Sequence, residues 1–226
     1  VVTSGNSLTD EYSLASLLAR VQYSYMSKYM FSAAIRADGS SRFGKNNRWG
    51  YFPSVSAAWR ISGEDFMSNT KGWLTDLKLR ASYGMTGNFQ IGNYTHLSTM
   101  DTDNYILGSG NGSETSGYKP TGVENPDLTW EKTGMANVGI DANFLNGYIT
   151  LTAEYYNSMT TDMLLNVPIP HLTGYSTTLM NIGKVNNRGV ELQIGSSHSY
   201  ENGLGYSFNA NFAKNINEVK ALGAND

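Results

Sequence analysis

Side chains able to carry out catalysis or to bind metal ions are few in this chain and stand far apart. The 226 residues include no Cys and only three His. His96, His171 and His198 show none of the spacings typical of a zinc site or a catalytic triad. The absence of Cys also excludes disulfides and thiol catalysis. We therefore predict no catalytic residues, no metal site and no cofactor, and a protein that is not an enzyme.

The segment DTDNYILGSGNGSE, at residues 101–114, is the strongest candidate for binding a cation or a phosphate. Its acidic residues lack the D-x-D-x-D-G order and the twelfth-position Glu of a calcium loop. Its GSGNG run matches neither a P-loop nor the G-x-G-x-x-G turn that precedes a helix. A polar loop is therefore the better explanation of this segment.

Basic and aromatic residues gather in a long predicted loop at residues 39–52. The basic cluster, which includes Lys45, could meet lipopolysaccharide phosphates or an acidic partner, and the aromatic rings could stack on sugars. The favoured alternative is a solvated loop that ends in an aromatic belt at a membrane interface. The candidate contacts of a substrate or partner are Arg42, Arg48, Trp49, Tyr51 and Phe52.

A second set of charged residues lies inside stretches in which polar and apolar residues alternate. These residues are Arg36, Arg60, Lys78, Arg80, Glu154 and Glu191. Each lies on the polar side of its stretch, where a water-filled or plugged lumen can solvate a charge. We predict that they face the lumen of a barrel.

The elements that position these residues are β-strands, because apolar residues recur with a period of two and almost nowhere with a helical period. We predict about eight strands of roughly nine to thirteen residues, longer than most strands of globular sheets. They cover residues 17–25, 31–38, 54–62, 77–84, 136–143, 149–156, 190–194 and 208–213.

The composition fits strands with one apolar face and one neutral polar face. Charged residues make up 15% of the chain, against about 25% in typical globular proteins. Aromatic residues make up 12%, and the net charge of -3 gives no support for a nucleic-acid partner. No apolar run is long enough for a transmembrane helix.

The predicted connections alternate between short and long. Short or moderate connections lie near 26–28, 63–75, 143–146 and 197–204, and long ones at 39–52, 85–130 and 157–186. In an up-and-down sheet, alternate connections lie at the same end. The long ones would therefore share one end, as in outer-membrane barrels with short periplasmic turns and long extracellular loops.

A soluble β-sandwich is the main alternative, since its strands alternate too. Strand length, the charges within the polar face and aromatic residues near the ends of the apolar face favour the barrel. The aromatic residues are Tyr23, Tyr25, Tyr29, Trp59, Tyr83 and Tyr155. The polar face carries small side chains, which suits part of a wide barrel better than a closed eight-stranded one. With no signal peptide at its start and the loop-like ALGAND at its end, we expect the chain to be a piece of a longer protein.

Five ordered stretches carry a specific resemblance that spans essentially the whole chain. They are DGSSRFG at 38–44, WGYFPSVSAAWRIS at 49–62, LRASYGMTGN at 79–88, NPDLTWEKT at 125–133 and NNRGVELQIG at 186–195. In this order they resemble landmarks in the C-terminal barrel region of SusC/RagA-type TonB-linked outer-membrane transporters.

The resemblance implies an all-β fold: an antiparallel transmembrane β-barrel, of which this chain supplies about eight of 22 strands. Residues 1–226 would form part of one TonB-dependent receptor barrel domain, without the plug domain and the TonB box. The implied location is the outer membrane of a Gram-negative, Bacteroidetes-type bacterium.

The function that the resemblance implies is nutrient import. The implied partners are outer-membrane lipids, a SusD-like surface lipoprotein, and TonB acting through the missing N-terminal region, with an oligosaccharide or peptide as substrate. Two alternatives remain open from the residues alone. One is a soluble or cell-surface all-β glycan-binding module, and the other is an outer-membrane protease or lipase.

Overall fold

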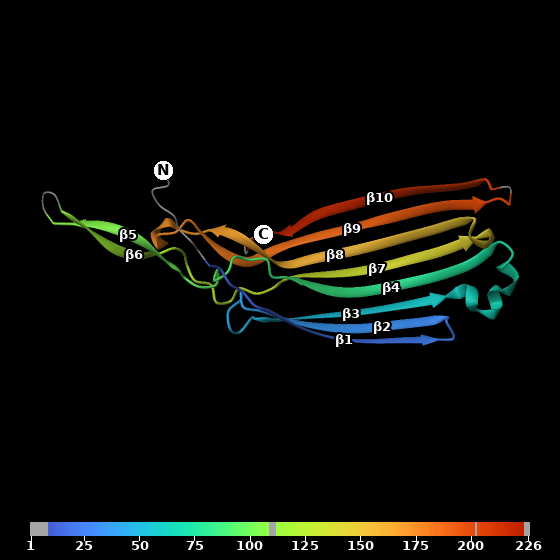
Figure 1. Ribbon diagram of the computed structural model, residues 1–226, viewed down its shortest axis with the longest axis horizontal. Helices are drawn as coiled ribbons and strands as arrows, with labels where there is room; N and C mark the ends of the chain where they lie inside the picture. Colours follow the sequence, from blue (N-terminus) through green and yellow to red (C-terminus); the bar gives the residue numbers. More distant parts are fainter. Residues whose placement is uncertain (1–8, 109–111, 202, 224–226) are drawn as a thin grey trace.

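The computed structural model describes residues 9–108, 112–201 and 203–223, and these residues form an antiparallel all-β structure (Figure 1). Eight strands make one sheet in the order β1-β2-β3-β4-β7-β8-β9-β10, and two more make a separate hairpin. The sheet contains β1 (Leu14–Tyr25), β2 (Tyr29–Ser40), β3 (Trp49–Arg60), β4 (Leu74–Asn88), β7 (Glu131–Phe144), β8 (Ile149–Pro168), β9 (Thr177–Ser199) and β10 (Gly205–Ala221). The hairpin contains β5 (Met100–Leu107) and β6 (Ser113–Pro120). The predicted eight-stranded antiparallel sheet is confirmed.

The register of the strands sorts the side chains of the sheet into an apolar face and a polar face. One row of cross-strand partners consists of Tyr23, Phe31, Ala57, Ala81, Val138 and Tyr155. The adjacent row consists of Gln22, Ser32, Ser56, Ser82, Asn137 and Tyr156. Successive residues of a strand point to opposite faces, so the two rows cover opposite sides of the sheet, as the alternation predicted.

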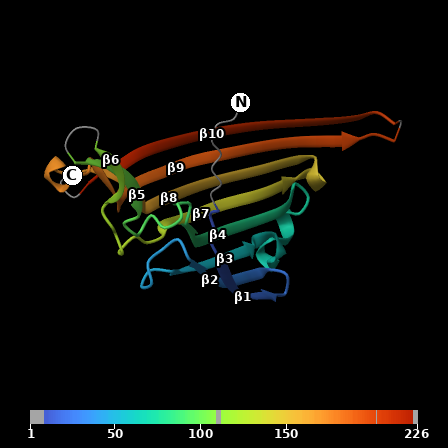
Figure 2. The same cartoon turned by 60° about the vertical axis from the view of Figure 1, so that its left-hand side comes forward.

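Short connections close one end of the sheet, which we call the turn end (Figures 1 and 2). Between β1 and β2 the chain reverses through Met26 and Ser27, both at positive φ, the geometry that matches the twist of a tight hairpin. Two 3₁₀ helices, η1 (Ile61–Gly63) and η2 (Asp65–Thr70), join β3 to β4, and η3 (Leu145–Gly147) joins β7 to β8. Residues 200–204 join β9 to β10.

The opposite end, the loop end, differs from the prediction in two shorter loops and in one additional hairpin. The prediction of a long loop at 157–186 is wrong, because β8 continues to Pro168 and β9 begins at Thr177. The loop at 39–52 is also shorter than predicted and covers residues 41–48. The extra strand residues carry little apolar alternation, since backbone pairing beyond a membrane needs no apolar face. No helix of the described residues is long and apolar enough to cross a membrane.

Hairpin β5–β6 projects from the loop end, away from the sheet (Figure 1). It arises inside the predicted connection at 85–130, where no strand was predicted. Tyr105 lies across Gly117: a Cβ atom on that glycine would lie 2.3 Å from the ring. Other apolar side chains are open to solvent, including Ile106 at 76% and Tyr118 at 68% exposure. The hairpin therefore has little packing of its own, and an isolated two-stranded hairpin is only marginally stable in water.

Buried apolar side chains are concentrated at the loop end, in a group that we call the rim cluster. Its members are Phe43, Phe52, Ile91, Leu128 and Trp130. The ring centroid of Trp130 lies 5.2 Å from that of Phe43 and 5.4 Å from that of Phe52. The Trp130 indole N–H donates to the Arg48 carbonyl at 3.1 Å, so its single polar group is satisfied. The cluster ties the loops between strands to the sheet.

The rest of the sheet is a single layer with both faces uncovered. The accessible surface is 15,694 Å², whereas a compact monomer of this mass exposes about 10,000 Å². Leu17 and Val21 of β1, for example, remain more than two-thirds exposed. Such a layer needs an apolar medium against one face and polar surroundings against the other.

Candidate functional site

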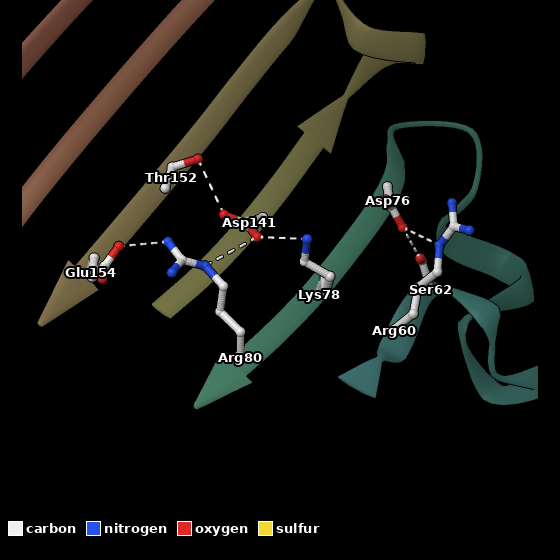
Figure 3. A network of polar contacts seen from close by, with 8 residues as sticks. All are labelled: Arg60, Ser62, Asp76, Lys78, Arg80, Asp141, Thr152 and Glu154. Carbon is white, nitrogen blue, oxygen red and sulfur yellow. Dashed lines mark hydrogen bonds and ion pairs between the residues drawn. The ribbon is translucent and has the colours of Figure 1, made fainter. Parts of the chain in front are cut away.

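The polar face carries a network of charged side chains across β3, β4, β7 and β8 (Figure 3). At its edge, the Arg60 Nε atom lies 2.8 Å from Asp76 Oδ1, and the Ser62 hydroxyl donates to the same oxygen. Arg60 is the last residue of β3 and Asp76 the third residue of β4, so this pair joins the two strands next to the η1–η2 connection.

The centre of the network joins β4, β7 and β8 (Figure 3). Asp141 Oδ2 lies 3.0 Å from Lys78 Nζ and 3.4 Å from Arg80 Nε, and its Oδ1 accepts a hydrogen bond from Thr152. Arg80 also reaches β8, where its Nη2 lies 2.7 Å from Glu154 Oε2. Arg80 therefore bridges two acidic residues on two successive strands.

Cross-strand pairing, a neighbouring glycine and partial hydration allow the sheet to hold these charges. Lys78 and Asp141 are cross-strand partners, as are Gly139 and Glu154. A Cβ atom on Gly139 would lie 2.9 Å from the Arg80 guanidinium carbon, so the glycine leaves the room in which Arg80 crosses to β8. The side chains of Arg80 and Glu154 are 33% and 22% exposed, hence partly hydrated and partly screened from water.

Glu191 lies next to the network on β9 but forms no ion pair with it. Its Cα partner on β8 is Glu154, so two like charges stand directly opposite each other, an unfavourable arrangement. The carboxylate of Glu191 has no side-chain partner among the described residues. Arg36, the last of the six predicted lumen residues, pairs with Asp38 at 2.7 Å farther up the polar face. All six lie within strands on this face, whereas their orientation toward a lumen remains a prediction.

Arg42 is held in place by the segments around it. Its guanidinium carbon lies 4.1 Å from the centroid of the Tyr12 ring, and its Nε donates to Asn93 Oδ1 at 2.7 Å. The His96 ring forms a hydrogen bond with the Arg42 carbonyl at 3.0 Å. Arg42 thus connects the approach to β1, the loop at 41–48 and the segment after β4. Arg48 lies in the same loop and has an exposed side chain.

The three aromatic candidates lie in β3, so their assignment to a loop is wrong. Phe52 is only 5% exposed because its ring packs in the rim cluster, which leaves no face for a sugar. Trp49 and Tyr51 are 52% and 64% exposed. They alternate with Phe52 and thus share the apolar face with Val55, which fits the aromatic belt rather than a contact inside a lumen.

At the turn end, Glu64 organises a small polar cluster. Its Oε1 accepts hydrogen bonds from the Tyr29 hydroxyl at 2.6 Å and from the Trp59 indole at 3.1 Å, and its Oε2 lies 3.1 Å from Lys28 Nζ. The hydrogen bond from Tyr29, followed by those from Trp59 and Lys28, holds the pKa of Glu64 below its ordinary value. The hydrogen bond with Glu64 raises the pKa of Lys28. These contacts fix the η1–η2 connection to the hairpin β1–β2.

The polar side chains described above form ion pairs and hydrogen bonds with one another. Across residues 9–108, 112–201 and 203–223, no group of three or more metal-binding side chains comes together. The segment at 101–114 forms β5 and the start of β6, and its residues 109–111 lie outside the described residues. In β5, Asp103 forms an ion pair with Lys119 at 3.3 Å, so this carboxylate already has a partner.

The comparison with protein families decides what such a sheet belongs to. A family model described as TonB dependent receptor-like, beta-barrel, matches residues 2–225. The chain belongs to the TonB-dependent receptor family. It is therefore part of an outer-membrane β-barrel, and the resemblance to the SusC/RagA type is confirmed by the relatives that it matches.

Curated relatives resemble the chain over nearly all of its length. TonB-dependent receptor P39 of Formosa agariphila is 39% identical over 224 residues, which cover 99% of this chain and 21% of that protein. TonB-dependent receptor SusC of Bacteroides thetaiotaomicron is 35% identical over 215 residues, which cover 94% of this chain and 21% of that protein. The chain thus spans about a fifth of the length of these relatives.

Solved structures share the fold as well. The RagAB peptide importer in its open-open state matches with a TM-score of 0.86 and 32% identity, over 99% of this chain and 24% of that chain. The closed-closed state matches with a TM-score of 0.83 and 33% identity, over 97% and 24%. Membership of this family rules out the soluble module and confirms that the chain is not an enzyme.

The sequence prediction missed several residues that build the site. Two of them are Asp76 and Thr152. Asp76 lies two residues from Lys78 in β4, and Thr152 lies two residues from Glu154 in β8, so the alternation places each on the polar face. Trp130 was noticed only as part of NPDLTWEKT. Its position just before the alternation of β7 marks it as a residue near the rim, but burial depends on loops that meet only in the folded chain.

Proposed function

We propose that this chain forms part of the barrel wall of a TonB-dependent importer that carries peptides or oligosaccharides across the outer membrane. The observation that carries the proposal is the combination of an ionic polar face with an apolar face on one layer of strands. In outer-membrane barrels the lumen side is polar and the lipid side apolar. The network around Arg80 would then line the lumen, and TonB would act through the part of the protein that precedes the barrel.

The wall acts as a scaffold in this proposal. Ion pairs between neighbouring strands hold the polar face in register while leaving it hydrated, so a plug or a passing substrate meets a fixed, wet surface. Glu191, which has no side-chain partner among the described residues of the wall, is available to a basic group on the plug or the substrate. The substrate would bind to the wall and pass along it, and no covalent bond would be made or broken.

Uptake by intact cells tests the proposal. Deleting the full-length gene and restoring it on a plasmid should abolish and recover uptake of one class in a panel of labelled peptides and oligosaccharides. Uptake by the restored strain should stop when TonB is removed. Undiminished uptake of both classes in the deletion strain would contradict the function, and uptake that persists without TonB would contradict the energy coupling.

We further propose that hairpin β5–β6 contacts a SusD-like lipoprotein above the barrel. Its exposed apolar side chains and its lack of packing favour a partner. The backbone N–H of Thr121 donates to the Thr99 carbonyl at 2.8 Å, so residues 100–120 can be replaced by a short Gly-rich turn without separating the ends. This deletion should abolish copurification of the full-length barrel with the lipoprotein. Undiminished copurification would exclude the hairpin as the contact.

A further inference from the structure

Basic residues gather where the apolar face of β9 and β10 ends, toward the loop end of the sheet. They are Lys184, Arg188, Lys214 and Lys220, which we call the outer basic patch. All four side chains are exposed. Charged residues are otherwise scarce on this face. Four positive charges so close together repel one another, so an anion beside them would be favourable.

The register fixes the face on which the patch lies. Arg188 is the Cα partner of Ile216, and Lys214 is the partner of Val190. A Cβ atom on the adjacent Gly189 would lie 2.8 Å from the ring of Tyr156, a member of the polar row. Gly189 therefore points to the polar face, and Arg188 points with Val190 to the apolar face.

The distance along the strands places the patch at the outer edge of the apolar band. At the turn end, the His198 ring lies 4.2 Å from that of Tyr148 and 6.4 Å from that of Tyr206, which makes an aromatic belt on the same face. Arg188 precedes His198 by ten residues, about 33 Å of strand. At the usual tilt of about 40° this is roughly 25 Å along the membrane normal, the height of the apolar band in such barrels.

The charges of the patch are not neutralised by the wall. Glu218 is the single carboxylate of β9 and β10 on this face within the described residues, and it pairs with Lys220 at 2.6 Å. Glu191, the other acidic residue of these strands, lies on the polar face opposite Glu154. Glu218 also attracts Arg188 at longer range, whereas Lys184 and Lys214 have no carboxylate partner in the part of the chain that the structure describes.

We propose that the outer basic patch binds the phosphate groups of outer-leaflet lipids. An Arg guanidinium can hold a phosphate through two parallel hydrogen bonds, and Lys supplies a flexible point charge. Lys214 lies slightly below the edge of the band, and its long side chain can reach the headgroup level while its methylene groups remain among acyl chains. The patch fixes the height of this part of the barrel in the membrane and recruits phosphorylated lipid beside β9 and β10.

Lipid binding by the full-length protein in detergent tests the proposal. The variant is Arg188→Gln with Lys214→Gln. The matched control is Arg20→Gln with Lys71→Gln, which removes one exposed charge from the polar face of β1 and one from the connection at the turn end. The probes are phosphorylated lipid A, dephosphorylated lipid A and inorganic phosphate. Affinity for phosphorylated lipid A should fall about tenfold to thirtyfold in the variant and remain unchanged in the control.

Each other outcome has a defined meaning. Equal affinity of wild type and variant for phosphorylated lipid A would overturn the proposal, as would equal wild-type affinity for the dephosphorylated lipid. Inorganic phosphate that displaces the lipid at matched concentration would show a free-anion site and would also overturn it. The exchange Arg188→Lys with Lys214→Arg should keep the affinity within about threefold, and heat-modifiable electrophoretic mobility confirms that every variant is folded.

Discussion

The rim cluster and the wall below it are built on different physical principles, although they belong to one chain. The rim cluster buries aromatic side chains as the core of a soluble domain does, and Trp130 is 2% exposed. In the wall, the strands form a single layer whose apolar residues stay open to the surroundings. The wall depends on strand pairing, cross-strand ion pairs and the membrane.

This difference shows where the chain itself determines its structure and where the membrane completes it. Burial of apolar area drives packing at the rim, so substitutions there should act in any solvent. In the wall, backbone hydrogen bonds and the lipid supply most of the stability, so side-chain substitutions should have smaller effects. The predictions below test this contrast in the full-length barrel.

Replacing Trp130 with Ala should have the largest effect. The change removes a buried ring that touches Phe43 and Phe52 and leaves a cavity, which costs about 3–5 kcal/mol. Urea unfolding in detergent, read at the loop end by protease sensitivity, measures the loss. Trp49→Ala is the matched control, because its ring is half exposed and should cost far less. Equal losses would contradict a packed core at the rim.

Adding a methyl group at Gly87 should have the next largest effect. A Cβ atom there would lie 2.0 Å from the Phe52 ring, so the ring must move out of the rim cluster, at a cost of about 1–3 kcal/mol. Gly72 is the control, since a Cβ atom there meets nothing within 4 Å. Denaturant midpoints compare the two Ala variants, and a Gly87→Ala protein as stable as Gly72→Ala would show that the ring is loosely held.

Removing the bridging charge of Arg80 should have a smaller, salt-dependent effect. Arg80→Gln leaves Glu154 facing Glu191 without its cation, but the partners are partly hydrated, so the loss is about 1 kcal/mol or less. It should shrink in high salt. Arg20→Gln is the control, because within the described residues Arg20 donates to the Ser32 hydroxyl and pairs with no carboxylate. A salt-independent loss above that of Trp130→Ala would reverse the contrast between rim and wall.

The smallest effect concerns Glu64 and depends on pH. Its lowered pKa means that the charged carboxylate favours the folded state, so the contribution is complete above the ordinary pKa of 4.5 and lost as pH falls through the lowered value. Wild type should therefore be more stable than Glu64→Gln at pH 7, and the difference should vanish in acid. Parallel stability profiles from pH 7 to pH 3 would show that Glu64 does not contribute as a carboxylate.

The sequence was sufficient for the wall because its pattern is local. Alternation in β2, β3 and β4 identifies strands and assigns Arg80 and Ala81 to opposite faces without knowledge of their neighbours. The ends of β8 and β9 escaped prediction because strands outside a membrane need not alternate. The β5–β6 hairpin was not predicted for the same reason, because several of its cross-strand pairs are polar, such as Asn104 and Ser116.

The site was only partly predictable for a physical reason. Parity along a strand places Arg36, Arg60, Lys78 and Glu154 on one face, but which charges meet depends on strand register. The burial of Phe52 and the contact of Arg42 with the Tyr12 ring depend on segments distant in sequence. Sequence alone could therefore identify charged residues of a wall, but not which loop residues are already engaged.

In the assembled barrel, the polar face should line an aqueous lumen and the apolar face should contact lipid. The chain contains no Cys, so single cysteines can be placed one by one at residues 190–194 of β9 in full-length protein in its native membrane. A water-soluble thiol reagent should label positions 191 and 193 and spare 190, 192 and 194, and a lipid-dissolved reagent should show the reverse. Uniform labelling by the water-soluble reagent, or the opposite alternation, would contradict the account.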